Sequence, residues 1–159
     1  MLDETKSYLH ELLKQLNMAR STLNYSYKIC SKIGKKDIYN EEEKDRFEAL
    51  TSKFARLSDL ILKKVIKTID ILDLDDSVET IRDTVNRAEK KSLIKSAREF
   101  IEIRKTRNEI AHEYFDSEND IIDIYKFVLD KTPVLAETVD RIIKYCKGKA
   151  YLEDTTSPD

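Results

Sequence analysis

The chain contains very little glycine, proline or cysteine, with two residues of each among 159. With so few glycines, none of the glycine-rich loops that bind nucleotide phosphates can be present. Cys30 and Cys146 are too few for a disulfide framework or a zinc site. No apolar run approaches the roughly 18 residues of a transmembrane helix. The first residues carry acids and no cationic region, so we expect no signal peptide, no membrane partner and a cytoplasmic location.

Charge is abundant but balanced. Lysine and arginine number 29 and aspartate and glutamate 31, so the net charge is −2 although 38% of the residues are charged. This balance excludes a polycation that holds nucleic acid through bulk charge. No cluster of carboxylates, histidines or cysteines resembles a metal site, so we expect no metal and no cofactor. The length fits one domain of roughly 100–200 residues, and the scarcity of glycine and proline predicts an all-α fold.

The spacing of apolar residues predicts two long helices. Stripes with steps of three and four residues run from Leu9 to Ile33 and from Phe47 to Ile69. Gly34 is expected to end the first helix. Asn40 is expected to cap the second, which should end at the acidic residues 73–76.

Two further helices follow in the pattern. Ser77 and Thr80 compete as caps of a short helix. A longer helix is predicted to begin near Ser92 and to run from about Leu93 to His112.

The last helix is expected to begin near Ser117 or Asn119, with Pro133 kinking or breaking it. Residues 151–159 have no periodicity and are expected to form a flexible acidic tail. Residues 1–150 are therefore predicted to form an antiparallel up-and-down bundle of four long helices and a short one.

The helix that ends near His112 does not separate its apolar and polar residues cleanly. At about 100° per residue, Arg107 falls between Phe100 and Ile103, in the middle of the apolar arc. Arg104 and Asn108 also fall inside this arc. Burying an unpaired arginine costs several kcal/mol, so these polar residues must be paired, solvated in a cleft or bound to an anion.

Two interpretations of this polar cluster stay open. In the first, it is a buried network of ion pairs, with Arg107 bound to Asp59 or Asp70 of the second helix. In the second, it lines a groove, inside the bundle or between two protomers, that offers cations to a phosphate. The helical phase does not separate the two.

A sequence motif lies at the same place. Residues Arg107 to Tyr114 read Arg-Asn-Glu-Ile-Ala-His-Glu-Tyr. An arginine followed after four to six residues by a histidine resembles the signature of the HEPN superfamily. The form Arg-x4-His-x-Tyr, with asparagine directly after the arginine, is similar to the HepT branch. The run from Ile121 to Leu135, with its Thr-Pro-Val-Leu step, also resembles that branch.

The resemblance implies a dimeric, metal-independent endoribonuclease that acts as the toxin of a type II toxin–antitoxin pair, on RNA such as tRNA or mRNA. Its antitoxin would be a nucleotidyltransferase of the MNT type that attaches AMP to Tyr114. The alternative for Tyr114 is a core tyrosine whose hydroxyl needs only one hydrogen-bond partner. His112 would move protons at the 2′-hydroxyl or the leaving 5′-oxygen, and Arg107 would stabilise the phosphorane. Asn108 would orient the imidazole or bind a phosphate oxygen. For Arg104 two roles stay open, an accessory phosphate contact and a salt bridge within the protein.

The spacing of the motif bears on the oligomeric state. Arg107 and His112 lie about 140° apart around an ideal helix, so they cannot meet one phosphate from the same face. Either the helix ends near His112, or a second protomer completes the site, and we expect a homodimer. The alternative function is a non-catalytic, HEPN-like partner or substrate-binding subunit of a nucleotidyltransferase.

Other conspicuous residues have structural interpretations. His10 is expected to be a surface histidine, and the two cysteines to behave as small apolar residues. A basic segment precedes the motif and is expected to be a solvated face, with guidance of RNA as the alternative. It comprises Lys90, Lys91, Lys95 and Arg98.

Overall fold

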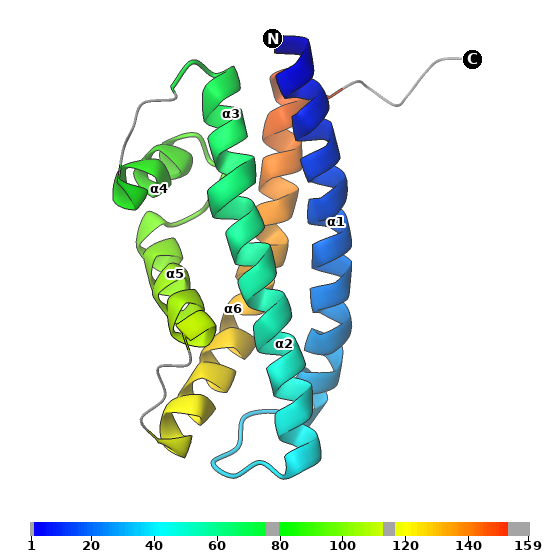
Figure 1. Ribbon diagram of the computed structural model, residues 1–159, viewed down its shortest axis with the longest axis vertical. Coiled ribbons are helices and arrows are strands. Elements are labelled where there is room, and N and C mark those ends of the chain that lie inside the picture. The colour runs from blue at the N-terminus through cyan, green and yellow to red at the C-terminus, as the bar shows by residue number, and fades with distance from the viewer. Residues whose placement is uncertain (1, 76–79, 113–116, 153–159) are drawn as a thin grey trace, which may run out of the picture.

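The computed structural model describes residues 2–75, 80–112 and 117–152, and every regular element in these ranges is helical (Figure 1). The all-α prediction is confirmed. The elements are α1 (Leu2–Ile33), α2 (Glu41–Asp59), the π-helical η1 (Leu60–Val65), α3 (Ile66–Leu72), α4 (Ile81–Lys90), α5 (Ala97–His112) and α6 (Glu118–Gly148).

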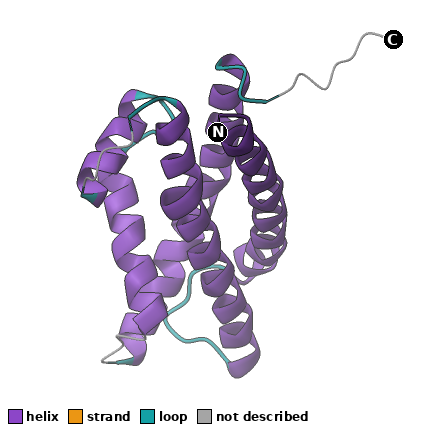
Figure 2. Ribbon diagram, turned by 45° about the horizontal axis from the view of Figure 1, so that its top comes forward, coloured by secondary structure: helices purple, strands orange, loops and turns teal. Residues whose placement is uncertain are grey.

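The helices form a bundle in which α1, α2 and α6 pack against one another, and α5 lies against α2 and α4. In Figure 1 the chain descends along α1, ascends along α2, η1 and α3, descends along α5 and ascends along α6. Figure 2, which is turned by 45° and coloured by secondary structure, shows the same helices and no strand in the described part of the chain. Among the described helices, none combines the length and the apolar character that crossing a membrane requires.

The connection between the first two helices follows the sequence prediction. Gly34 adopts a φ of 78°, a left-handed conformation that glycine reaches without steric cost, and its N–H donates to the carbonyl of Cys30 at 2.8 Å. The Asn40 side chain accepts a hydrogen bond from the N–H of Glu43, whose side chain accepts one from the N–H of Asn40. This capping box satisfies donors at the start of α2 that the helix itself leaves unpaired.

The apolar stripe from Phe47 to Ile69 is fully buried, and it stays on one side because the α-helix changes to a π-helix at Leu60–Val65. Three successive steps of four residues lead from Leu57 through Ile61 and Val65 to Ile69. In a regular α-helix each step would turn the stripe by about 40°, or about 120° in all. The wider turn of η1, in which the N–H of Ile66 donates to the carbonyl of Ile61, compensates for this drift. All four stripe residues are therefore 0% exposed.

The prediction that a helix begins near Ser92 is wrong. Ser92 has a φ of 62°, and its N–H donates to the carbonyl of Glu89 while that of Leu93 donates to Ala88. These bonds form a left-handed C-terminal cap, so Ser92 ends α4. The next helix begins only at Ala97.

The remaining caps are resolved by the structure. Thr80 caps α4 in a capping box with Asp83, whereas Ser77 lies outside the described residues. Ser117, rather than Asn119, caps α6. Pro133 lies inside α6, which continues to Gly148, so the proline does not break the helix.

Tyr151 and Leu152, at the start of the segment expected to be a tail, pack against the core. The N–H of Tyr151 donates to the carbonyl of Cys146 at 2.9 Å. The other residues of that segment, 153–159, lie outside the described residues.

Candidate functional site

The candidate site lies on the C-terminal half of α5. The first half of this helix packs into the bundle through Ala97, Phe100 and Ile103, which are buried. Beyond Ile103 the helix is less covered, and His112 is exposed. The polar residues of the motif therefore lie at the boundary between core and solvent. The half-exposed residues are Arg104, Arg107, Asn108, Glu109 and Ile110.

Arg107 is bound to the second helix. Its Nη2 donates to Oδ2 of Asp59 at 2.6 Å, and its Nη1 donates to Oδ1 of Asn108 at 3.3 Å. The side chains of Arg107 and Asp59 are 19% and 29% exposed, so water screens the pair only partly. Of the two partners that the sequence suggested, Asp59 is confirmed. Asp70 instead accepts a hydrogen bond from Arg87 at 3.1 Å.

The site carries an excess of positive charge. Nζ of Lys63, which lies in η1 one turn after Asp59, is 3.6 Å from the same Oδ2 of Asp59. One carboxylate thus faces two cations, Arg107 and Lys63. The Nε of Arg107 is buried and has no hydrogen-bond partner among the described residues. A buried donor without a partner costs free energy, so this position of the Arg107 guanidinium lowers the stability of the fold.

The other motif residues take the following places. Arg104 lies one turn before Asn108 on α5, and no ion pair or hydrogen bond joins its side chain to any other residue in the described ranges. His112 lies one turn beyond Asn108 at the end of the helix as described. Tyr114, the expected site of modification, lies outside the described residues.

Sequence reasoning missed the contribution of η1 and Lys63. The π-helical turn begins at the residue after Asp59, and such turns occur often at functional sites. The run of three steps of four in the apolar stripe was the signal that could have found it. Within η1, Lys63 then falls on the solvent side next to Asp59.

A second polar cluster lies at the other end of the bundle, around Lys91. Its Nζ lies 2.8 Å from Oδ1 of Asp70, 2.9 Å from Oδ2 of Asp73 and 2.8 Å from Oδ2 of Asp75. Although burial opposes it, the hydrogen bonds with these carboxylates raise the pKa of Lys91. The Lys91 ammonium is therefore bound by three carboxylates and largely buried, so the expectation that it belongs to a solvated basic face is wrong.

Asp73 also joins the end of α6 to this cluster. It accepts hydrogen bonds from the hydroxyls of Tyr145 and Tyr151. Burial would raise the pKa of Asp73, but these hydrogen bonds and that of Lys91 outweigh it and lower the pKa. The same arrangement, mainly through burial, raises the pKa of Tyr151 to about 12. This network fastens α3, α4 and the end of α6 together.

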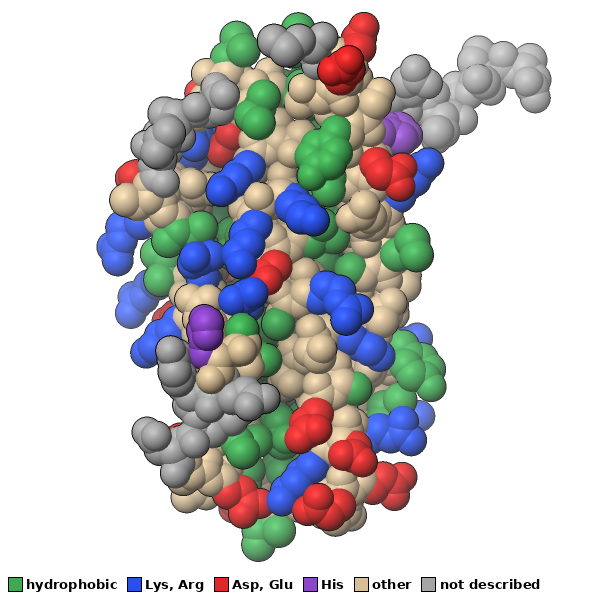
Figure 3. Space-filling model, viewed as in Figure 1, with side chains coloured by type: hydrophobic (Ala, Val, Ile, Leu, Met, Phe, Trp, Pro, Cys, Tyr) green, Lys and Arg blue, Asp and Glu red, His purple; other side chains and the backbone are tan. Residues whose placement is uncertain are grey.

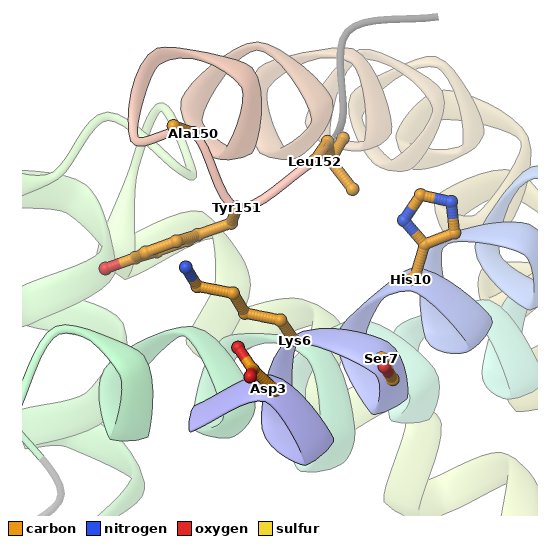
Figure 4. A pocket seen from close by; sticks show the side chains of 7 residues that line it. All are labelled: Asp3, Lys6, Ser7, His10, Ala150, Tyr151 and Leu152. Carbon is orange, nitrogen blue, oxygen red and sulfur yellow. The ribbon is translucent and has the colours of Figure 1, made fainter. Parts of the chain in front are cut away.

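A cavity of about 740 Å³ opens between the start of α1 and the residues that follow α6 (Figure 4). His10 is exposed, as expected, and lines this cavity. In the close-up, Lys6 reaches toward Tyr151 while His10 stands apart from both. Neither Arg107 nor His112 lines it. Its walls are formed by Asp3, Lys6, Ser7, His10, Ala150, Tyr151 and Leu152.

No three histidine, cysteine, aspartate or glutamate side chains in the described part of the chain are grouped to hold a metal ion. Comparison with protein-family models gives no match, and neither does comparison with curated proteins. Similarity to the HEPN superfamily therefore stays a prediction from the sequence, made on the residues Arg107 to Tyr114.

Proposed function

We propose that this chain is a metal-independent endoribonuclease of the HepT-like kind, the cytoplasmic toxin of a type II toxin–antitoxin pair. The observation that carries the proposal is the position of Arg107, a half-buried guanidinium held beside Asn108 on the helix that carries the exposed His112. A planar cation near solvent suits a phosphate, because its fork of N–H donors matches the phosphate oxygens.

The proposed reaction uses the RNA's own 2′-hydroxyl as the nucleophile. His112 accepts the 2′-proton while the 2′-oxygen attacks phosphorus, and the bond from phosphorus to the 5′-oxygen breaks. The leaving oxygen takes up the proton that His112 accepted, which returns His112 to its starting form and leaves a 2′,3′-cyclic phosphate and a 5′-hydroxyl. Arg107 stabilises the negative charge that develops on the phosphorane, and Asn108 and Arg104 position the phosphate.

The proposal includes a homodimer. Arg107 and His112 are five residues apart on one helix, and the 140° between them, about the angle in an ideal helix, leaves them on different faces. A second protomer packed against α5 would supply His112 to the Arg107 of its partner. We also propose the detailed arrangement of the helices. It is an antiparallel up-and-down bundle of four long helices and a short one, with a kink in α6 near Pro133.

RNA cleavage in the presence of excess EDTA tests the activity. We expect single-stranded RNA or tRNA to be cut, and an oligonucleotide with one 2′-deoxy nucleotide to resist cleavage at that nucleotide, because the nucleophile is missing there. Cleavage after the 2′-deoxy nucleotide would contradict the mechanism. Loss of all activity in EDTA would contradict its independence of metal.

The second part of the proposal is control by a nucleotidyltransferase antitoxin of the MNT type, which attaches AMP to Tyr114. Each added nucleotide carries a phosphate charge next to the motif and would repel the RNA backbone. Co-expression with the neighbouring nucleotidyltransferase should give AMP-sized mass increments on the Tyr114 peptide, absent from Tyr114→Phe. Full neutralisation of Tyr114→Phe by the antitoxin would contradict modification as the switch.

One observation favours the alternative, a non-catalytic partner or substrate-binding subunit of a nucleotidyltransferase. The ion pair between Arg107 and Asp59 already gives the guanidinium a structural role. In that case Arg107→Ala would lower stability while the purified protein would cleave no RNA. A stable complex with the nucleotidyltransferase would still form.

A further inference from the structure

The rod formed by α2, η1 and α3 carries an unusual concentration of positive charge. Between Thr51 and Ile69 the sequence holds five lysines and arginines but only one acid, Asp59, although the whole chain has a net charge of −2. Figure 3 shows lysine and arginine side chains gathered over the middle of this face, along α2, α3 and α5. Acidic side chains gather at its lower end.

Four of the five cations lie on the solvent side of the rod, and we call them the basic ridge. They are Arg56, Lys63, Lys64 and Lys67, and all four are exposed. The fifth, Lys53, is excluded because its ammonium donates to the hydroxyl of Ser26 at 2.7 Å. The distance along the rod from Arg56 to Lys67 is about 16 Å, which is long enough for the ridge to follow more than one phosphate of a strand.

Most of the ridge has no counter-charge among the residues that the structure describes. No ion pair in the described ranges involves Arg56, Lys64 or Lys67, whose side chains face water. Like charges three and four residues apart on a helix repel one another, so the ridge is electrostatically unfavourable by itself. A polyanion would relieve this repulsion and would gain the entropy of the counterions released from its phosphates.

The ridge is continuous with the candidate site. Lys63 belongs to the ridge and lies 3.6 Å from the Asp59 oxygen that also binds Arg107. We propose that the basic ridge binds the phosphate backbone of single-stranded RNA and leads it to Arg107. This inference rests on the proposed function for the nature of the ligand. Because the ridge offers only cations, it would read no base sequence and would fix only the path of the strand.

The test compares Lys64→Ala/Lys67→Ala with a matched control, Lys28→Ala/Lys32→Ala, on α1. Each variant removes two exposed lysines that form no ion pair with the described residues, so neither should unfold the protein. The probe is a fluorescent oligouridylate with 2′-O-methyl groups, which cannot be cleaved because its 2′-oxygens are blocked. Binding is followed by fluorescence anisotropy between about 50 and 200 mM KCl, where phosphate contacts dominate the salt dependence.

Four phosphate contacts predict a slope of log K against log salt of about −3, since each contact on a single strand contributes about −0.7. The ridge variant keeps two of the four contacts, so its slope should be shallower, about −1.4, and it should bind at least about fivefold more weakly at the lowest salt. The control should match the unmodified protein. In cleavage assays the ridge variant should raise KM and leave kcat unchanged, because its lysines bind RNA away from the reacting atoms.

These measurements distinguish a failure of the ridge inference from a failure of the proposed nuclease activity. Salt-dependent binding that requires the ridge, without any RNA cleavage, would contradict the proposed nuclease but support the ridge. Cleavage that depends on His112, with equal binding and KM in the two double variants, would overturn the ridge inference and leave the nuclease in place. The ridge inference would also be overturned if the ridge variant lost binding to vesicles of anionic phospholipid but still bound RNA. The ridge would then be a membrane-binding surface.

Discussion

Replacement of Asp59 by alanine removes the counter-charge of Arg107 and leaves a half-buried guanidinium unpaired. An exposed ion pair contributes about 0–1 kcal/mol, and removing one partner of a fully buried pair costs about 3–5 kcal/mol. The two side chains here are 19% and 29% exposed, which places the pair between these limits. We therefore expect Asp59→Ala to lower the free energy of unfolding by about 2 kcal/mol.

A double-mutant cycle separates the pair from other effects of the substitutions. Urea unfolding of Asp59→Ala, Arg107→Ala and the double variant should give a coupling energy of about 1–2 kcal/mol. Arg104→Ala is the control for stability, because it removes an arginine of the same helix that has no ion pair among the described residues. It should change stability by less than about 0.5 kcal/mol. A coupling energy near zero would show that the ion pair does not stabilise the fold.

Three further predictions concern the fold. Asn40→Ala should cost about 1 kcal/mol in urea unfolding, because the capping box is lost; no loss would contradict the cap. Burial raises the pKa of Cys30 to about 11 and that of Cys146 to about 12, so at about pH 8 both thiols should react with Ellman's reagent only after unfolding. Although burial opposes it, hydrogen bonds lower the pKa of Asp73, so its stabilisation is complete above its unfolded value of about 3.9 and is lost as the pH falls through the folded value. Asp73→Asn should therefore destabilise the protein at about pH 7 and much less near pH 2; an equal effect at both would contradict this.

The long helices could be predicted because local chemistry determines their ends. Gly34 supplies the left-handed residue that ends α1, and Asn40 supplies the cap of α2. The same reasoning gave a wrong prediction at Ser92, because a serine before an apolar run is typical of a helix start. In the structure it adopts a left-handed conformation and ends α4 instead. A side chain that can serve at either end of a helix gives the sequence no means of choosing between them.

The candidate site could be located from the sequence but not assembled. Helical phase places Arg107 in the apolar arc of its helix, and the ion-pair interpretation offers Asp59 and Asp70 as partners, but phase does not give the distance to either. The choice between Asp59 and Asp70 depends on the height at which α5 packs against α2, and on the π-helical turn that follows Asp59. Lys91 was assigned to a solvated face because its three carboxylate partners come from a segment that only the tertiary fold brings near it.

The rate of RNA cleavage by four purified proteins tests most directly whether this chain is a ribonuclease that uses Arg107 and His112. These are the unmodified chain, Arg107→Ala, His112→Ala and Lys105→Ala, the last of which removes an exposed cation of α5 outside the proposed site. Each variant is first shown to be folded by circular dichroism. We predict that the first two substitutions lower the rate at least about 100-fold, because one removes the charge that stabilises the phosphorane and the other the proton-transfer group, while Lys105→Ala cleaves as the unmodified chain does. Equal rates in all four proteins would contradict the account.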